Sequence, residues 1–147
     1  MNPFFSIIIP VYNSEKYLTI CLNSVLRQNF NDYEILIIND ASRDNSKKKC
    51  NNFSKISSKI KIIENKKNLG VSISRNKGIR NARGKYIVFL DSDDILLPGS
   101  LKDLYQHILL NKTNIVILKH KELKNNYKNF IKRDSETRGF FKKKTFS

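Results

Sequence analysis

Apolar residues along this 147-residue chain follow two alternating patterns. Four short runs are rich in β-branched and aromatic residues at consecutive or alternating positions, which predicts strands. They cover residues 4–10, 33–39, 59–64 and 86–90. Between them, apolar residues recur every three or four positions, which predicts helices over residues 15–28, 44–57 and 71–82. Because strands and helices alternate, the sequence predicts an α/β fold with a mostly parallel sheet and helices on both faces.

Two of the predicted strands differ in their surroundings. The third alternates apolar and charged residues, so we expect it near an edge of the sheet. The fourth, Tyr86–Leu90, is apolar throughout, so we expect a central strand that is buried on both faces. It runs directly into Asp91, Asp93 and Asp94. Three carboxylates so close together favour a bound divalent cation. A solvated acidic turn that caps the following helix is the alternative.

Several residues mark where helices begin and end. Ser14 precedes the first helix as an N-cap, and Gly84 follows the third as a C-cap. Pro98 starts a further helix at a position where proline is tolerated. Residues 114–118 predict a fifth strand, after which the regular pattern is lost. Asp94 is assigned either to helix capping or to support of the acidic cluster.

Composition excludes several classes of protein. Apolar residues make up 39% and charged residues 28% of the chain, which is typical of globular and not of disordered proteins. No apolar run reaches the length of about 18 residues that a membrane-spanning helix needs. The apolar start of the chain lacks the basic region and cleavage site of a signal peptide. We therefore expect a cytoplasmic protein.

The formal charge of +15 predicts attraction to anionic partners. Residues 119–147 carry +7 of it, from ten basic and three acidic side chains, together with four phenylalanines. This segment is either a solvated tail or a basic, aromatic surface in peripheral contact with an anionic membrane at its inner face. No nucleic-acid-binding motif is present, so we expect no nucleic-acid partner.

Ligands of a parallel sheet bind beyond the carboxyl ends of its strands. There the first strand presents the ring of Tyr12, the second presents Asp40, and the fourth presents the acidic cluster. A nucleotide needs such a set: a ring for its base, an acceptor for a base N–H, and a metal for its diphosphate. Neither GxGxxG nor GxxxxGK[ST] follows the first strand. Metal and cationic side chains therefore have to meet the phosphate charge instead of backbone amides.

Five segments, in order along residues 4–118, resemble the family 2 glycosyltransferases, which have the GT-A fold. The segments are Ser6-Ile7-Ile8-Ile9-Pro10-Val11-Tyr12-Asn13, Tyr17-Leu18 to Gln28, Glu34 to Asp40, Asn68-Leu69-Gly70 to Gly84-Lys85-Tyr86, and Phe89-Leu90-Asp91-Ser92-Asp93-Asp94. The resemblance implies transfer of a sugar from a nucleotide sugar, commonly a UDP-sugar, with inversion at the anomeric carbon. The acceptor would be a saccharide or a lipid-linked molecule in polysaccharide or glycoconjugate biosynthesis.

The same resemblance implies roles for individual residues. Those beside the nucleotide sugar would be Pro10, Val11 and Tyr12 at base and ribose, Asp40 at a base N–H, Arg75 at base or diphosphate, and Asp91 and Ser92 at ribose and phosphates. Asp93, with Asp91, would bind Mn²⁺ or Mg²⁺, which suits oxygen ligands and a diphosphate. Simpler roles stay open for three residues: Tyr12 in packing, Asp40 as a helix cap, and Arg75 as an exposed residue without a partner.

The chain departs from the family in its second half. Members usually continue into an acceptor half that supplies a carboxylate general base. Asp134 and Glu136 are the last acids here, and neither stands in a comparable setting, so the general base is not identifiable. We predict a nucleotide-sugar-binding domain over residues 1–118 and the start of a truncated acceptor half over residues 119–147. The alternative function is a domain that binds the nucleotide sugar without transferring it.

Overall fold

The computed structural model describes residues 2–114, which form two compact units. The first unit contains residues 2–26 and 31–96, and the second contains residues 27–30 and 97–114. Apart from Asn114, the predicted fifth strand lies outside the described residues, as does the whole basic segment 119–147. The division of the chain at residue 118 therefore stays a prediction.

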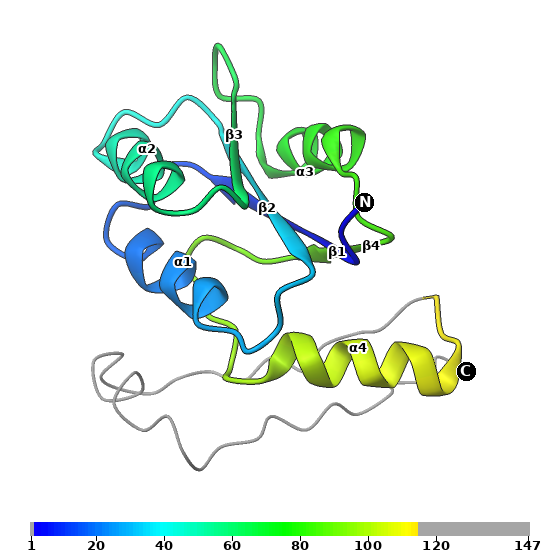
Figure 1. Cartoon of the computed structure of the whole chain (residues 1–147). Helices are drawn as coiled ribbons and strands as arrows, with labels where there is room; N and C mark the ends of the chain where they lie inside the picture. The colour runs from blue at the N-terminus through cyan, green and yellow to red at the C-terminus, as the bar shows by residue number, and fades with distance from the viewer. Residues whose placement is uncertain (1, 115–147) are drawn as a thin grey trace. The chain divides into compact units, whose positions relative to one another are not determined.

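The first unit is built on a sheet of four parallel strands (Figure 1). The strands are β1 (Phe5–Val11), β2 (Tyr33–Asn39), β3 (Ile60–Glu64) and β4 (Tyr86–Phe89). They are joined by the helices α1 (Leu18–Leu26), α2 (Ser46–Ile56) and α3 (Val71–Asn81). The strand order is β3-β2-β1-β4, with every neighbouring pair parallel. The predicted α/β fold is confirmed, as is the edge position of β3.

The strand order places the helices on both faces of the sheet. From β1 through β2 to β3 the chain moves in one direction, and the connection through α3 returns it past β1 to β4. Since such crossovers are right-handed, α1 and α2 lie on one face and α3 lies on the other. Figure 1 shows this arrangement, with α1 and α2 on the opposite side of the strands from α3.

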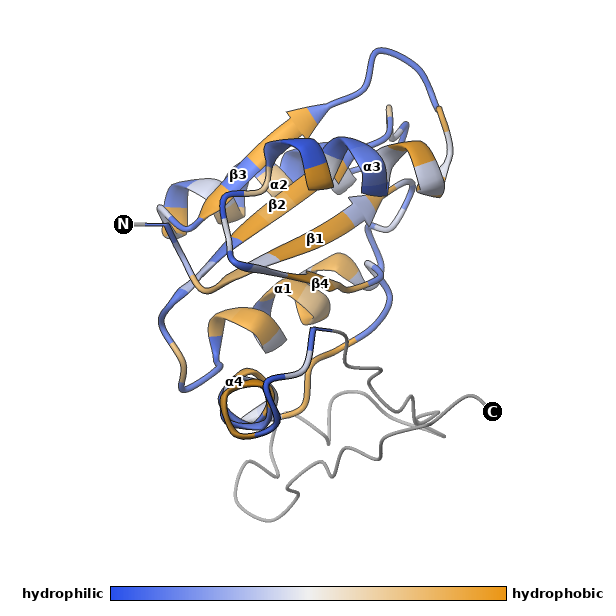
Figure 2. Cartoon of the chain, turned by 90° about the vertical axis from the view of Figure 1, so that its right-hand side faces the viewer, coloured by the Kyte–Doolittle hydropathy of each residue, from blue (hydrophilic) through white to orange (hydrophobic). Residues whose placement is uncertain are grey.

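The core lies along β1 and β2, whose residues are all buried. Figure 2 shows these two strands as apolar over most of their length. α3 packs closely on its face of the sheet because it carries Gly78. A Cβ at that position would lie 2.4 Å from Cγ2 of Ile8 on β1. Complete burial on both faces accounts for the consecutive apolar residues of these two strands.

β4 does not match its prediction as a central strand buried on both faces. It pairs with β1 on one side and is an edge of the sheet formed by residues 2–114. Val88 is buried, but Ile87 and Phe89 are 37% and 47% exposed. A run of consecutive apolar residues predicts a strand, but it does not show whether other elements bury one or both faces of that strand.

The first helix begins later than its sequence indicates. α1 starts at Leu18, because residues 15–17 form turns in which the carbonyl of Ser14 accepts the N–H groups of Tyr17 and Leu18. The Ser14 hydroxyl does not cap this helix; it points to Ser92 instead, 2.6 Å away.

The second unit is a helix, α4 (Ser100–Asn111), with the short segment of residues 27–30. Pro98 lies two residues before α4, and its N-cap is Gly99, without a side-chain hydrogen bond. The Gln28 side chain holds the start of α4, donating to the Leu97 carbonyl at 2.8 Å and accepting from the Leu101 N–H at 3.2 Å. Since no side chain caps α4, the acidic residues 91–94 do not act as its cap.

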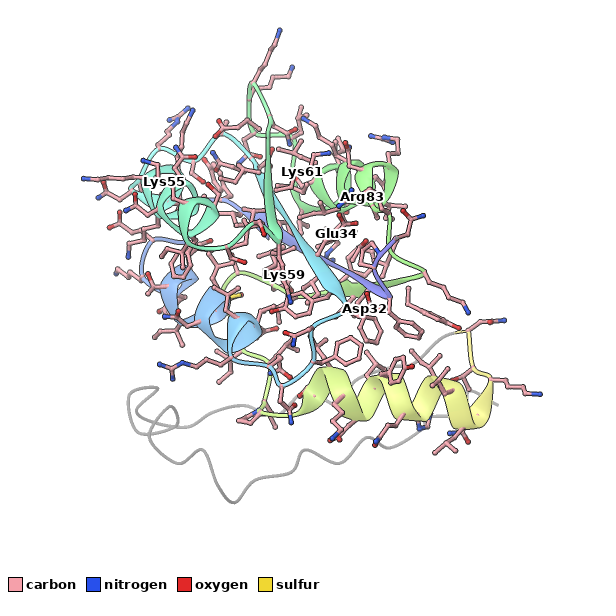
Figure 3. All side chains as sticks on the ribbon, in the orientation of Figure 1. Asp32, Glu34, Lys55, Lys59, Lys61 and Arg83 are labelled. Carbon is pink, nitrogen blue, oxygen red and sulfur yellow. The ribbon has the colours of Figure 1, made fainter. Side chains whose placement is uncertain are left out.

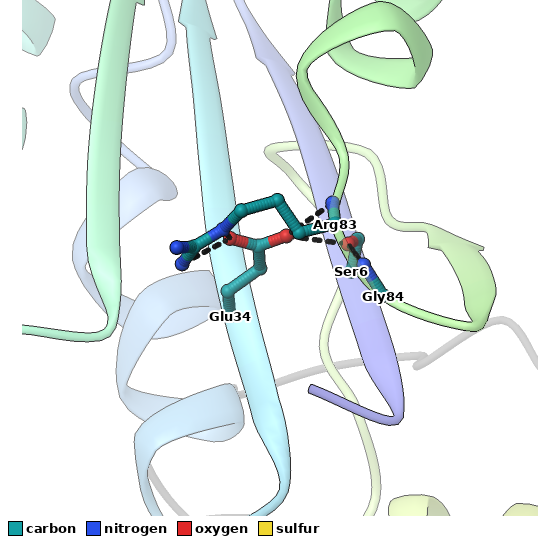
Figure 4. A network of polar contacts seen from close by, with 4 residues as sticks. All are labelled: Ser6, Glu34, Arg83 and Gly84. Atoms are coloured by element: carbon teal, nitrogen blue, oxygen red, sulfur yellow. Dashed lines mark hydrogen bonds and ion pairs between the residues drawn. The ribbon is translucent and has the colours of Figure 1, made fainter. Parts of the chain in front are cut away.

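A buried carboxylate joins three segments of the first unit near the amino ends of β1 and β2 (Figure 4). Glu34 accepts hydrogen bonds from Ser6 Oγ and the Arg83 N–H, each 2.7 Å long, and pairs with the Arg83 guanidinium at 3.0 Å. The Gly84 N–H donates to Ser6 Oγ at 2.8 Å. Burial alone would raise the pKa of Glu34, but the hydrogen bonds from Arg83 and Ser6 and the Arg83 charge lower it. The network holds the α3–β4 connection against β1 and β2.

Within residues 2–114, none of the helices is both long enough and apolar enough to cross a lipid bilayer.

Candidate functional site

The candidate site lies at the carboxyl ends of β1, β2 and β4. β1 stands between the other two: the Asp40 N–H donates to the Val11 carbonyl at 2.8 Å, and the Leu90 N–H donates to the Ile8 carbonyl at 3.1 Å. α1 leaves β1 on one face, whereas α3 enters β4 from the other. This is the topological switch point, where open parallel sheets bind their ligands.

β1 ends at Val11, one residue beyond the predicted end at Pro10. Both residues are buried. Pro10 is tolerated inside the ladder because its missing N–H faces β4, which has already ended at Phe89. Tyr12 follows and is 43% exposed, so its ring is not a core packing residue.

The backbone that carries Tyr12 is held in place by the loop after β2. Asn13 adopts a left-handed conformation with φ of 49°, which asparagine tolerates better than most residues. Its N–H donates to Ser42 Oγ at 3.1 Å, and its side-chain oxygen accepts the Arg43 N–H at 2.8 Å. An exposed aromatic ring therefore stands on a fixed turn at the switch point.

Asp40 is 3% exposed, and its carboxylate organises the loop before α3. Oδ1 accepts from Asn65 Nδ2 at 2.7 Å and from the Leu69 N–H at 2.9 Å, while Oδ2 accepts from the Gly70 N–H at 2.8 Å. Burial opposes ionisation of Asp40, but the hydrogen bonds outweigh it and lower the pKa of this carboxyl. Asp40 thus supports the start of α3 and does not cap α2, the helix that follows it in sequence.

Arg75 has a partner, contrary to the simpler interpretation of an exposed helical arginine. Its Nη2 lies 2.5 Å from Asp91 Oδ1, and its guanidinium lies 5.7 Å from the centre of the Phe89 ring. Both charged side chains are partly exposed. α3 and the end of β4 thereby place a cation and a carboxylate side by side at the carboxyl end of β4.

Ser92 is buried, and its hydroxyl lies 2.6 Å from Ser14 Oγ. Ser14 Oγ in turn donates to the Tyr12 carbonyl at 3.2 Å, and the Ser14 N–H donates to Ser46 Oγ at 2.8 Å. Ser14 therefore ties the acidic loop after β4 to the loop after β1 and to the start of α2. Sequence reasoning assigned Ser14 only to a helix end.

Asn65 is the other residue of this region that sequence reasoning missed. It is buried, and its side-chain N–H groups bond Asp40 and, at 3.2 Å, Ser74 Oγ. A signal for it exists: Asn65 follows β3 directly, as Asp40 follows β2, and both positions open onto the same edge of the sheet.

Asp93 is exposed and forms no hydrogen bond or ion pair within residues 2–114. Asp94 lies beside it and donates its N–H to the Asp91 carbonyl at 3.0 Å, which closes the turn. Within the same residues, no three His, Cys, Asp or Glu side chains gather as a metal site of the protein alone. A single free carboxylate next to a bound diphosphate nevertheless fits Mg²⁺ or Mn²⁺, which commonly take one or two carboxylates and complete their shell with phosphates and water.

Comparison with known proteins places this arrangement in context. Residues 6–147 match the sequence pattern of the family described as glycosyl transferase family 2. The chain is 32% identical over 117 residues to the glycosyltransferase GlyG of Streptococcus pneumoniae, covering 80% of this chain and 39% of GlyG. It is 35% identical over 121 residues to WfgD of Escherichia coli, named a UDP-Glc:alpha-D-GlcNAc-diphosphoundecaprenol beta-1,3-glucosyltransferase, covering 82% of this chain and 47% of WfgD.

A solved structure of similar fold is Staphylococcus aureus TarS, residues 1–349, in complex with UDP-GlcNAc. The TM-score is 0.78 at 30% identity, and the match covers 86% of this chain and 36% of that one. The chain thus spans less than half the length of each of these relatives.

Proposed function

Because the chain belongs to glycosyl transferase family 2, we propose that it is the sugar-donor-binding part of an enzyme that transfers a sugar from a nucleotide sugar. The observation that carries this proposal is the convergence at one switch point of an exposed ring, a buried ionised carboxylate and an arginine–aspartate pair beside a free carboxylate. The structure of TarS, a relative of similar fold, was solved in complex with UDP-GlcNAc. We therefore propose a UDP-sugar as the donor here.

The base and ribose would lie against the end of β1. Tyr12 presents its ring to solvent on a fixed turn, which suits stacking on a flat base. Pro10 and Val11, which are buried at the end of β1, would lie beneath the base and ribose. Asp40 would accept a base N–H alongside the hydrogen bonds that it already accepts from Asn65 and from the backbone of residues 69 and 70.

The diphosphate would lie between α3 and the loop after β4. Arg75 offers a cation there, and Ser92 and Asp91 border the same space. Asp93, with Asp91 beside it, would hold Mn²⁺ or Mg²⁺ together with the phosphates. When bound, that ion would act as a Lewis acid that stabilises the departing nucleoside diphosphate. This chain's own residues would orient the diphosphate, with Arg75 released from Asp91 or shared with it.

For the whole reaction, we propose that the acceptor is a saccharide or a lipid-linked molecule and that the sugar is transferred with inversion. The product would belong to polysaccharide or glycoconjugate biosynthesis. WfgD supports a lipid-linked acceptor, because its name specifies a GlcNAc-diphosphoundecaprenol. The general base is not among the residues assigned here.

Calorimetric titration of the chain with UDP, with and without Mn²⁺, tests sugar-donor binding. We expect Mn²⁺-dependent binding that Asp93→Asn weakens by at least about tenfold, as loss of a charged metal ligand should. Asp32→Asn is the matched control, since Asp32 is exposed at the amino end of β2, away from the site (Figure 3). Unchanged affinity in Asp93→Asn, or no binding of any nucleotide, would contradict the proposal.

Turnover separates transfer from mere binding. Incubation with UDP-sugar, Mn²⁺ and a polyprenyl-diphosphate saccharide should release free UDP if the chain transfers sugar. If UDP binds but none is released on addition of acceptor, the alternative holds, and the chain is a nucleotide-sugar-binding domain without transferase activity.

A further inference from the structure

Positive charge is distributed unevenly along the described chain. Residues 43–85 contain fourteen basic and two acidic side chains, a formal charge of +12. Residues 2–42 and 86–114 each contain two basic and four acidic side chains, a formal charge of −2. A lysine-rich composition alone would raise all three segments, so the contrast calls for a local explanation.

The fold gathers much of this charge at one side of the first unit. Residues 43–85 include the edge strand β3, the helix α2 that packs on it, and α3, whose Lys77 reaches the Glu64 carbonyl at the end of β3. Figure 3 shows Lys55 on α2, Lys61 on β3, and Lys59 directly before β3. We name this side the lysine edge and define it by Lys47, Lys55, Lys59, Lys61, Lys66, Lys67 and Lys77.

Few acids neutralise the lysine edge. Lys47 pairs with Glu64 at 2.9 Å. Lys59 and Lys77 donate to uncharged oxygens, at the Asn31 carbonyl and at the Glu64 carbonyl and Asn65 side chain. The other four lysines are exposed and have no hydrogen-bond or ion-pair partner within residues 2–114; they are Lys55, Lys61, Lys66 and Lys67.

The lysine edge also has a surface depression near the carboxyl end of β3. This shallow depression of about 600 Å³, largely open to solvent, lies beside the loop after β3 and is lined by Glu64, Asn65, Lys66, Lys67, Leu69 and Lys77. At the carboxyl end of α2, the side chain of Ile56, next to Lys55, is 73% exposed. The edge therefore combines cations, an open depression beside two of its lysines, and one exposed apolar side chain that can enter an interface.

We propose that the lysine edge is a docking surface for an anionic phospholipid bilayer. Clustered lysines near an anionic leaflet each add attraction that requires no fixed geometry, because the ammonium group acts as a point charge. Lysine on an edge strand also discourages pairing with another sheet. That second role accounts for Lys61 on β3, but not for the lysines of α2 and of the loop after β3.

Lipid fits this surface better than nucleic acid does. Proteins that bind single strands stack bases on exposed aromatic rings, and base edges are read mainly by arginine, asparagine and glutamine. Phe53 is the one aromatic residue of residues 43–85, and it is buried. Two of the four arginines in this stretch, Arg75 and Arg83, already pair with carboxylates away from the edge.

Co-sedimentation of the full chain with vesicles tests the proposal. The vesicles contain phosphatidylcholine, alone or with an equal part of phosphatidylglycerol. We expect binding only to the anionic vesicles and a decline with added salt. The variant Lys55→Gln/Lys61→Gln/Lys66→Gln/Lys67→Gln should bind about six-hundredfold more weakly, at about fivefold for each of its four lysines.

A matched variant with the same net charge separates a local surface from general attraction. Lys16→Gln/Lys85→Gln/Lys102→Gln/Lys112→Gln changes four exposed lysines outside the lysine edge. We expect it to retain most vesicle binding. Equal losses in the two variants, or none in the first, would overturn the proposal.

Two further measurements complete the test. UDP titration of the first variant should match the unaltered chain, which shows that the fold is intact and keeps this proposal separate from the proposed transferase function. Fluorescence anisotropy with labelled DNA is the second. A larger loss of DNA binding than of vesicle binding in that variant would assign the lysine edge to nucleic acid and overturn the proposal.

Discussion

Arg75 on α3 and Asp91 at the end of β4 form an ion pair, with 2.5 Å between Nη2 and Oδ1. The two side chains come from elements on different layers of the first unit, and both are partly exposed. Exposed ion pairs contribute only about 0–1 kcal/mol to stability. The pair is therefore better explained by the charge it presents to a ligand than by the stability it adds to the fold.

Arg75→Gln should consequently leave stability nearly unchanged and weaken nucleotide binding. We expect the free energy of unfolding in urea to fall by less than about 1 kcal/mol. The affinity for UDP in calorimetry should fall about tenfold or more, since hydrogen bonds to charged groups contribute about 1.5–3 kcal/mol. Arg80→Gln, an exposed arginine on the same helix, is the control. A loss of stability without a loss of affinity would contradict this role.

Ser14→Ala should act on the acidic loop through Ser92. Removal of the 2.6 Å contact leaves a buried hydroxyl without this partner, which should cost about 1–2 kcal/mol of unfolding free energy. UDP affinity should fall as well, because the loop that carries Asp91 and Asp93 loses its link to β1. Ser54→Ala is the control, since the Ser54 hydroxyl donates within its own helix, to the Asn51 carbonyl at 3.0 Å.

The coupling between Ser14 and Ser92 is itself measurable. A double-mutant cycle with Ser14→Ala and Ser92→Ala should give an interaction energy of about 0.5 kcal/mol or more. Strictly additive effects would show that the two hydroxyls do not act together.

Stability should depend on pH through Glu34 and Asp40. The pKa of each carboxyl is lowered in the folded state, so the unfolded chain binds protons more readily. Their contribution is complete above the ordinary values of about 4 and is lost as pH falls through the folded-state values. Urea unfolding across the acidic range should show a steep loss of stability.

Glu34→Gln isolates one of these two carboxyls. It should cost about 2–3 kcal/mol at neutral pH and flatten the acid loss, because the glutamine has no proton to gain. Glu64→Gln, at an exposed glutamate, should change neither result much. A Glu34→Gln variant with the unaltered acid profile would contradict the assignment.

Gly84→Ala should destabilise the fold through a backbone clash. A Cβ at this position would lie 2.5 Å from the Ser6 N and 2.6 Å from the Phe5 carbonyl carbon, and neither atom moves without distorting β1. We expect a loss of about 1–3 kcal/mol, as for other overpacked sites, measured by urea unfolding. Lys85→Ala, at the exposed next residue, should stay within about 0.5 kcal/mol of the unaltered chain.

The local pattern of apolar residues was sufficient to predict the strands and their parallel orientation. Fully buried strands need apolar residues on both faces, and a parallel sheet needs a helix between successive strands, so β1 and β2 and their connections are visible in the sequence. The rule that ligands bind at the carboxyl ends of parallel strands likewise predicts, from the sequence alone, that Tyr12, Asp40 and Asp91 lie at one edge of the sheet. The roles assigned to them in binding remain predictions.

Local pattern could not reveal which polar groups pair across the fold. The Ser14 hydroxyl meets Ser92, 78 residues away, and Asp40 meets the backbone of residues 69 and 70. Gly84 resembles a helix C-cap in sequence, but its role is close approach to β1. Each partner depends on which elements become neighbours in space.

The order of strands and helices, and the residues that follow the strand ends, can be predicted from local patterns in the sequence. The edge position of β4 in the described sheet, the pairing of Arg75 with Asp91 and the grouping of lysines around β3 and α2 became visible in the folded structure. The difference arises from the range of the interactions. Hydrophobic periodicity is encoded within each segment, whereas hydrogen bonds, ion pairs and charged surfaces form between side chains that only the packed sheet brings together.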